Sequence, residues 1–315
     1  AQPILVDCEP RTLCMDPSAV EAAIAEYRDK VEIRALLPVH YGGQMADMEA
    51  LLPIAARNGL SVIEDAAHCL PAYRRCSSEM DWKPVGSGST AACFSFYANK
   101  CITTGEGGMI TTNDDDFAAR VRMMSLHGLS KSAWNRFSSR GSWYYEIEEP
   151  GFKYNLTDLQ GALGVEQLRK ADRLWQSRRR VAQSYTRYFA DLQEFVQIPE
   201  EREDRQSSWH LYPVRLNTEA LSIDRAEFIE QLKSRGITCS VHWMPLHMHP
   251  YYRRSYGYEP HHYPVAEAEW KRIISLPIFP SMTEEQIQYV VKAIGEIAET
   301  HASSRYQPGA LVAGD

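Results

Sequence analysis

Two short apolar runs, separated by one lysine and a glycine-rich turn, constrain this chain more than any other segment. The first run spans residues 91–96, the second begins at Met109, and Lys100 stands between them, ahead of Gly105-Glu-Gly-Gly108. A lysine on a short loop between two buried strands cannot easily reach water. Burial raises the free energy of its charged ammonium form, which favours the neutral, nucleophilic amine. The pattern indicates a Schiff-base lysine, and the glycines indicate a turn that lets the loop double back. If the segment stood alone, a surface-turn lysine between two strands would be the favoured interpretation.

A second segment, residues 60–68, ends a β-type run in two carboxylates followed by small residues. It predicts a buried parallel strand with Asp65 at its carboxyl end, the edge where open α/β sheets bind ligands. A carboxylate there is costly unless it meets a cation or a donor. The protonated pyridine nitrogen of pyridoxal phosphate (PLP) is such a partner, and His68 could lie against that ring or bond its phenolic oxygen. The alternative for Asp65 is a helix N-cap; together with Ser95 and Lys100, the cofactor interpretation is favoured.

Strand and helix patterns alternate along the first half, which predicts an α/β fold with a mainly parallel sheet covered by helices. The expected strands are residues 3–7, 33–40, 60–65 and 109–112, and the expected helices are 16–24, 48–57 and 114–126. Residues 127–154 are aromatic and serine-rich without a clear period, which is typical of a loop that borders a substrate cleft.

A smaller α+β domain is expected after a large domain over residues 1–176. A helix from Thr157 to about Arg187, packed by leucines, leads into the second domain over 177–302, and 303–315 is predicted to be a disordered tail. The leucines are Leu159, Leu163 and Leu168; the later strands are expected at 209–216, 237–243 and 273–280, and the helices at 225–235 and 283–300.

Composition excludes several classes of protein. The 315 residues carry a net charge of −7, which argues against a nucleic-acid partner. No apolar run approaches membrane-spanning length and no secretory signal opens the chain, so no membrane association is expected. The seven cysteines form no CxxC pair, which favours reduced thiols in the cytoplasm over disulfides or zinc.

Four motifs in order carry a resemblance to a known family: residues 64–68, 94–100, 104–108 and 150–158. The set resembles the DegT/StrS-type sugar-nucleotide aminotransferases, and is most similar to the branch of 4-keto-sugar aminotransferases of aminoarabinose and perosamine synthesis. The likeness runs from the first residues to about Ile297. It implies a fold type I, aspartate aminotransferase-like, PLP-dependent homodimer that moves an amino group from glutamate to a nucleotide-linked 4-keto-sugar.

The resemblance also implies roles for individual residues. Lys100 would form the imine with the cofactor and later shuttle a proton, Asp65 would pair with the pyridine nitrogen, and His68 would contact the ring. Ser95 would bind the phosphate, and Asn155 would reach the phosphate of the neighbouring subunit's cofactor.

Family members normally carry a further stretch, with a phosphate-binding loop, before the residues that match Ala1. This part of the family fold is absent from the sequence, which is either a fragment of a longer gene product or a protein that lacks these elements. A truncated sensor or scaffold protein is therefore one alternative. A sugar-nucleotide 3-dehydratase is another, but there a histidine replaces the Schiff-base lysine, so Lys100 argues for amino transfer. Another lyase or decarboxylase of the same fold is disfavoured only by the motif set as a whole.

The histidines also suggest metal binding. His247, His249 and the pair 261–262 could ligate zinc, but no cysteine or carboxylate cluster has companion spacing, so surface or loop histidines and no metal are expected. The resemblance places His242 near the active-site mouth. There it would hold a substrate oxygen or phosphate, with a satisfied core histidine as the alternative.

Overall fold

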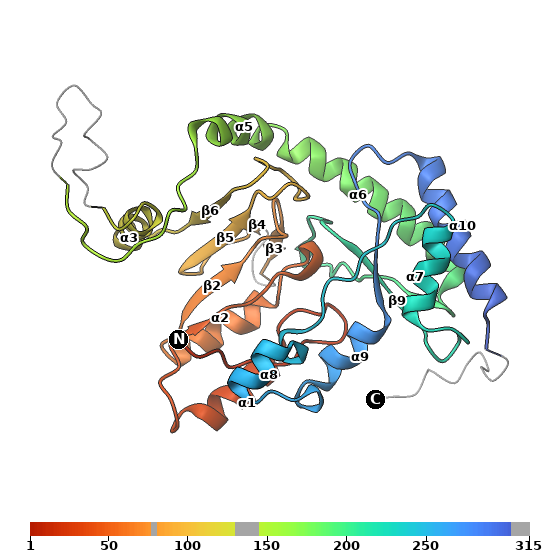
Figure 1. The fold of residues 1–315 in the computed structure, drawn as a ribbon, viewed down its shortest axis with the longest axis horizontal. Coiled ribbons are helices and arrows are strands. Elements are labelled where there is room, and N and C mark those ends of the chain that lie inside the picture. Colours follow the sequence, from red (N-terminus) through yellow and green to blue (C-terminus); the bar gives the residue numbers. More distant parts are fainter. Residues whose placement is uncertain (77–80, 130–144, 304–315) are drawn as a thin grey trace.

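The computed structural model describes residues 1–76, 81–129 and 145–303 (Figure 1). Most of the predicted 127–154 loop and nearly all of the predicted 303–315 tail lie outside these residues. The strands are β1 Ala35–Leu36, β2 Ser61–Asp65, β3 Tyr73–Arg75, β4 Trp82–Pro84, β5 Ala91–Ser95, β6 Gly108–Thr111, β7 Val196–Gln197, β8 Arg205–Gln206, β9 Tyr212–Leu216 and β10 Ile273–Leu276. The α-helices are α1 Pro17–Tyr27, α2 Met48–Arg57, α3 Asp115–Ser125, α5 Asp158–Leu168, α6 Ala171–Tyr188, α7 Arg225–Ser234, α8 Pro250–Tyr256, α9 Pro264–Arg272 and α10 Glu284–Thr300.

A four-stranded sheet in the order β1-β2-β5-β6 organises the first half of the chain. The β1–β2 and β2–β5 pairs are parallel, and β5–β6 is antiparallel because the glycine-rich turn folds β6 back beside β5. Helices α1 and α2 supply Val20, Ile24, Leu51 and Ile54 to the core against this sheet. The prediction of a mainly parallel sheet covered by helices is confirmed.

The second half has its own apolar core around an antiparallel sheet in the order β10-β9-β7. Helices α6, α7 and α10 pack on this sheet, with Tyr185, Phe189, Tyr212 and Phe228 fully buried among them. A small third sheet, β4-β3-β8, joins residues 73–75 and 82–84 to residues 205–206. The expected domain boundary at residue 176 falls inside α6, and the division into two domains stays a prediction.

The predicted strand over residues 3–7 is wrong. This segment crosses to the second half of the chain, because the Asp7 carboxylate accepts hydrogen bonds from the amides of Val265 and Ala266, each at 2.9 Å, at the start of α9. The Tyr258 hydroxyl donates to the Pro3 carbonyl at 2.5 Å. Local β propensity is overridden by these contacts across the fold.

Two further predictions differ from the structure. Residues 237–243 form no strand, only a single bridge between Ser240 and Ser275. The helix predicted over 157–187 is two helices, α5 and α6, with a break at residues 169–170. The three leucines expected to pack α5 are exposed instead, with 85% of Leu159, 45% of Leu163 and 59% of Leu168 accessible. Among the described residues, no helix is long and apolar enough to cross a membrane.

Candidate active site

The register of the sheet places Asp65 and Ser95 on the same face, at its carboxyl edge. Asp65 pairs laterally with Cys93 in the parallel β2–β5 ladder, and Ser95 lies two residues further along β5. Paired residues, and residues two apart on one strand, point to the same side of a sheet. The exposed Asp65 carboxylate accepts the Ala67 amide at 3.0 Å. It therefore caps the next turn locally and still faces outward from the strand end.

Glu64 points to the opposite face and anchors the same strand end. Its carboxylate meets the imidazole of His40 at 2.7 Å, and both side chains are almost fully buried. The Ala46 amide donates to His40 Nδ1 at 3.1 Å, so the proton of a neutral imidazole sits on Nε2, which donates to Glu64. Burial alone would raise the pKa of Glu64, but its hydrogen bond and charge interaction with His40 bring it below the ordinary value.

The loop that carries Lys100 is closed by its own backbone. The Phe96 amide donates to the Gly107 carbonyl at 2.8 Å, and the Thr104 amide donates to the Phe96 carbonyl at 3.0 Å. At Gly107, with φ at +156°, a side chain would overlap Thr104, so the turn requires glycine as predicted. Lys100 is half-buried. Burial lowers the pKa of its amine, and the Asp65 carboxylate opposes that shift.

His68 is buried and bonded through one nitrogen to the neighbouring turn. The Gly42 amide donates to His68 Nδ1 at 3.2 Å, and the His68 ring stacks on Trp243 with centroids 5.0 Å apart. Burial, and then the charges of Lys100 and His242, lower the pKa of His68 to about 3. The ring is therefore neutral, and its proton lies on Nε2, the nitrogen that Gly42 leaves free.

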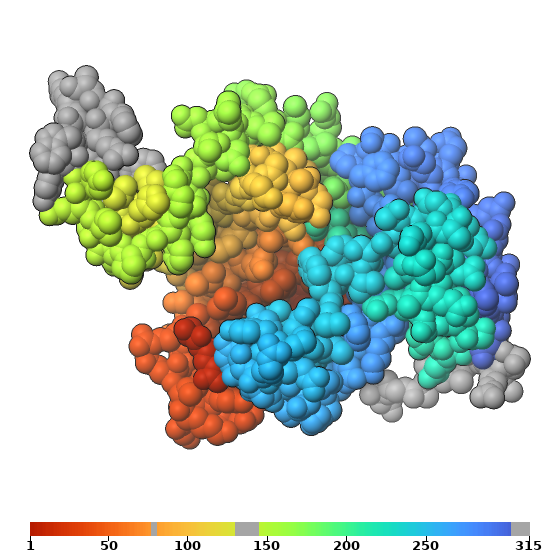
Figure 2. Space-filling view, viewed as in Figure 1, coloured from red at the N-terminus to blue at the C-terminus, as the bar shows by residue number. Residues whose placement is uncertain are grey.

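His242 is a neighbour of His68 and precedes Trp243, which stacks on the His68 ring. Its Nδ1 is 2.8 Å from the Ser275 hydroxyl, and the Tyr41 hydroxyl donates to its carbonyl at 2.7 Å. Burial, and then Lys100, lower the pKa of His242. His242 and Trp243 line an apolar cavity of about 500 Å³. The surface is hollowed where the orange sheet residues meet the cyan and light-blue residues of the second half (Figure 2).

Of the six predicted residues, five are brought together and one is not. Asp65, His68, Ser95, Lys100 and His242 share the sheet edge or its facing wall. Within the described residues Asn155 makes no contact with the other five; it lies three residues before Asp158, the first residue of α5, and its side-chain oxygen accepts a hydrogen bond from Lys153.

His210 is a neighbour of the site that sequence reasoning missed. Its ring centroid is 4.5 Å from that of His68, and only 6% of the residue is exposed. The segment from Trp209 has the pattern of an ordinary strand, in which a histidine attracts no notice. The one available signal is that a polar ring stands inside an otherwise apolar run.

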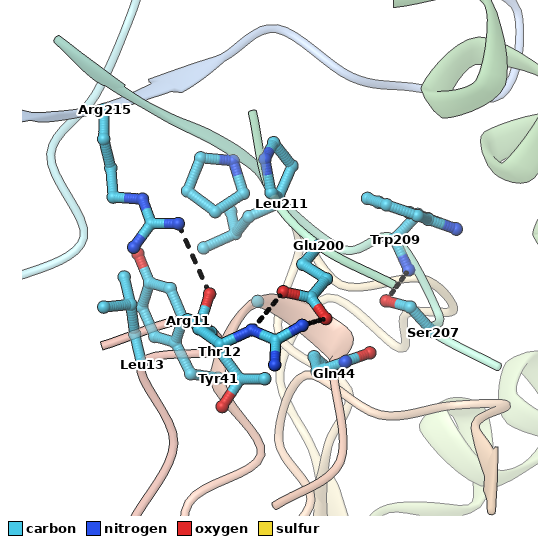
Figure 3. A pocket seen from close by; sticks show the side chains of 13 residues that line it. Arg11, Thr12, Leu13, Tyr41, Gln44, Glu200, Ser207, Trp209, Leu211 and Arg215 are labelled. Carbon is cyan, nitrogen blue, oxygen red and sulfur yellow. Dashed lines mark hydrogen bonds and ion pairs between the residues drawn. The ribbon is translucent and has the colours of Figure 1, made fainter. Parts of the chain in front are cut away.

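A smaller pocket lies on the far side of the Tyr41–Gly42 turn (Figure 3). Arg11 closes one side by a bidentate ion pair with Glu200, at 2.6 and 2.9 Å, and Arg215 donates to the Arg11 carbonyl at 3.3 Å. The space amounts to about 30 Å³, roughly enough for one water molecule and far too small for a cofactor.

The histidines considered as possible zinc ligands, at positions 247, 249, 261 and 262, belong to no group of side chains arranged as a metal site among the described residues. Within residues 1–76, 81–129 and 145–303, no group of three His, Cys, Asp or Glu side chains is arranged to hold an ion. The expectation that His247 is a surface residue is wrong. His247 packs against Tyr263 with ring centroids 4.6 Å apart, and only 3% of the residue is exposed.

Comparisons with known proteins identify the family of the chain. Residues 1–295 match the model of the DegT/DnrJ/EryC1/StrS aminotransferase family. The chain is 41% identical to the spore coat polysaccharide biosynthesis protein SpsC of Bacillus subtilis over 300 residues, covering 95% of this chain and 74% of SpsC. The identity is high enough, over enough of both chains, to establish common ancestry.

Solved structures give the same result. Helicobacter pylori PseC, an aminotransferase involved in the biosynthesis of pseudoaminic acid, superposes with a TM-score of 0.81 at 27% identity, over 95% of this chain and 74% of PseC. Streptococcus pneumoniae Spr1654, a putative sugar aminotransferase, matches in its pyridoxamine phosphate form with a TM-score of 0.83 at 27% identity, over 95% and 75% of the two chains. Its PLP form matches with a TM-score of 0.82. The fold is thus that of the fold type I aminotransferases, and the chain belongs to the DegT/DnrJ/EryC1/StrS family of PLP-dependent sugar aminotransferases.

Proposed function

We propose that this protein transfers an amino group from glutamate to a nucleotide-linked 4-keto-sugar, with Lys100 as the catalytic base and Asp65 as the cofactor anchor. The observation that carries the proposal is that Lys100 and Asp65 lie close together at one sheet edge. Burial lowers the pKa of the Lys100 amine, and the Asp65 carboxylate acts against that shift. An amine poised in this way can be neutral when it attacks and charged when it returns a proton.

The residues present fit a PLP cofactor. Asp65 offers an exposed carboxylate to a pyridinium nitrogen, Ser95 on the same face offers a hydroxyl to a phosphate, and Lys100 offers an amine between two strand ends. The cofactor, when bound, supplies an electron sink for the carbon that loses its proton.

Each residue then has a defined task. Asp65 must stay ionised to keep the ring nitrogen protonated. Lys100, once freed, takes the proton from the Cα atom of the amino donor and can return a proton later in the reaction. His68, neutral with its proton on Nε2, offers a hydrogen-bond donor without adding positive charge beside Lys100.

The acceptor would lie against the wall that carries His242. The adjoining cavity of about 500 Å³ is lined mainly by apolar side chains, which suits a sugar linked to a larger group better than it suits a free amino acid. The nucleotide linkage, the 4-keto position and glutamate as donor come from the family resemblance. Amino transfer is preferred to 3-dehydration because Lys100 is present.

A homodimer with shared sites is part of the proposal. Asn155 lies three residues before the start of α5, a helix without a buried residue, and α5 exposes the side chains of Leu159, Leu163 and Leu168. Exposed apolar groups at helical spacing are costly in water and are typical of a surface covered by another subunit. A second copy placed there would bring its own Asn155 toward the neighbouring site.

The test is a chemical trap. Protein incubated with PLP and reduced with borohydride should gain the mass of one phosphopyridoxyl group, that is the cofactor less one water and plus two hydrogens, on the peptide that contains Lys100, and Lys100→Arg should not. Lys170→Arg, at an exposed lysine, is the control. Turnover with glutamate and a panel of nucleotide-linked keto-sugars then identifies the acceptor. Labelling at Lys100 without turnover on any keto-sugar would support the sensor alternative, and absence of labelling would refute the proposal.

A further inference from the structure

Two imidazoles, rather than one, stand behind the candidate cofactor position. His210 and His68 approach to 4.5 Å between ring centroids at an interplanar angle of 44°. Both are buried, with 6% of each residue exposed. His210 thus belongs to the wall of the site, although it comes from a segment 142 positions downstream of His68.

The same backbone turn fixes both histidines. The Gly42 amide donates a hydrogen bond to His68 Nδ1 at 3.2 Å. The Gly42 carbonyl accepts a hydrogen bond from the amide of Leu211, the residue after His210, at 3.0 Å. Ser208 closes the arrangement, since its hydroxyl donates to the His68 carbonyl. These contacts fix the two segments that carry the rings relative to each other.

Hydrogen bonding through Nδ1 does not explain the presence of His210. Its Nδ1 is buried without a hydrogen-bond partner in the part of the chain that the structure describes. An unpartnered buried nitrogen costs free energy, so a residue kept only for packing would more often be apolar. The principal interaction of the side chain is its ring contact with His68.

Burial, and then the charged and titratable groups that face the pair, keep both rings neutral. They are Lys100, His242 and Arg178, whose guanidinium donates to the His210 carbonyl at 3.3 Å. Burial, and then His68 and Lys100, hold the pKa of His210 well below its ordinary value. A neutral His210 covers His68 without adding charge.

We propose that His210 is a positioning residue: its ring holds the imidazole of His68 in place, so that His68 keeps Nδ1 on the Gly42 amide and presents Nε2–H to the cofactor side. The inference rests on the proposed function only for the identity of the group that His68 meets. The arrangement of the two histidines can be tested without any cofactor.

The test measures the tautomer and the proton affinity of His68 by NMR of the histidine ring nitrogens, in the whole chain without cofactor. The His68 signal is assigned as the one that is lost in His68→Gln. Replacing the ring with His210→Ala opens space beside His68. We expect His68 to become a mixture of tautomers and to bind a proton at least about tenfold more tightly, one pKa unit upward. His210→Phe, which keeps a flat ring, should leave the tautomer and the proton affinity within about threefold of the original protein.

His261→Gln, at an exposed histidine, is the matched control and should change neither quantity. If His210→Ala fails to fold, His210→Gln is read in the same way. An unchanged His68 signal in both ring-free variants would overturn the inference, whatever their melting temperatures. Cofactor binding and turnover are measured separately, so a failure of the proposed function would leave this result interpretable.

Discussion

The imidazole of His40 and the carboxylate of Glu64 meet at 2.7 Å directly beneath the strand end that presents Asp65. Adjacent residues of β2 thus serve opposite faces: Glu64 is bonded into the interior, and Asp65 is free to meet a ligand. Because the interior bond fixes the strand end, it also fixes the direction of the Asp65 carboxylate. Stability and site geometry are coupled at this point of the fold.

Removing the Glu64 side chain should therefore be costly. Glu64→Ala leaves His40 Nε2 and the Gly86 amide, which donates to Glu64 at 3.1 Å, without an acceptor. We expect a loss of about 3 kcal/mol in the free energy of unfolding, measured by urea titration. Glu64→Gln keeps an acceptor oxygen and should lose less than half as much. Equal losses in the two variants would contradict this account.

The same pair predicts a pH dependence. The pKa of Glu64 is lower in the folded chain than its ordinary value of 4.5, so its ionised form stabilises the fold. That contribution is fully present above pH 4.5 and is lost as the pH falls through the lowered pKa. Urea titrations from neutral pH down to about pH 3 should show a steeper loss of stability for the original protein than for Glu64→Gln. Parallel curves would show that Glu64 is not the responsible group.

Asp65→Asn should abolish turnover while leaving the fold intact. Loss of the carboxylate removes the group that holds up the pKa of Lys100, so that pKa should fall further. The pH at which the Lys100 amine becomes half-reactive toward an acylating reagent, followed by mass spectrometry without cofactor, should move downward. Turnover should drop by about 10²-fold or more. Asp29→Asn, at an exposed carboxylate, is the control, and full activity of Asp65→Asn would refute the assignment.

The apolar side chains of α5 predict the assembly state. Leu159→Asp combined with Leu163→Asp places charges where a second subunit is expected to pack, and a buried unpaired charge strongly opposes association. Light scattering after size exclusion should show a dimer for the original protein and a monomer for the double variant. Val31→Asp, at an apolar residue 45% exposed after α1, should leave the dimer intact. A monomeric original protein with full activity would contradict the shared-site proposal.

The sequence was most informative where local chemistry determines structure. The strand ending at Asp65, the closed Lys100 loop and the glycine turn follow from residues near one another in the chain. The structure of residues 3–7 does not follow from local sequence, because the Asp7 carboxylate accepts a hydrogen bond from the Val265 amide at the start of α9, 258 positions away. The exposure of Leu159 was equally hidden, since an amphipathic pattern does not distinguish a core from an interface.

The wall of the candidate site shows the same limit. The short spacing after Asp65 points to His68, whereas His210 reaches His68 through contacts of Gly42 and Gly43 with residues 208 and 211. No periodicity in the sequence encodes that approach. Gly43 marks it in retrospect, since this glycine allows the two backbones to meet.

Gly43→Ala should therefore damage both stability and the site. Gly43 has φ at +111°, and a Cβ there would overlap the Ser208 hydroxyl and lie 2.9 Å from the Trp209 amide nitrogen. The strained backbone and the overlap together should cost about 3 kcal/mol or more in the free energy of unfolding. Gly59→Ala is the matched control, because Gly59 has φ at +65° but no atom within 4 Å of the position that a Cβ would take. It should cost only about 1 kcal/mol.

The His68 ring signal should move in Gly43→Ala and stay in place in Gly59→Ala, since only the first disturbs the turn that binds His68 Nδ1. Similar losses of stability in the two variants, with His68 unmoved in both, would show that the close approach of the two backbones does not hold the site together.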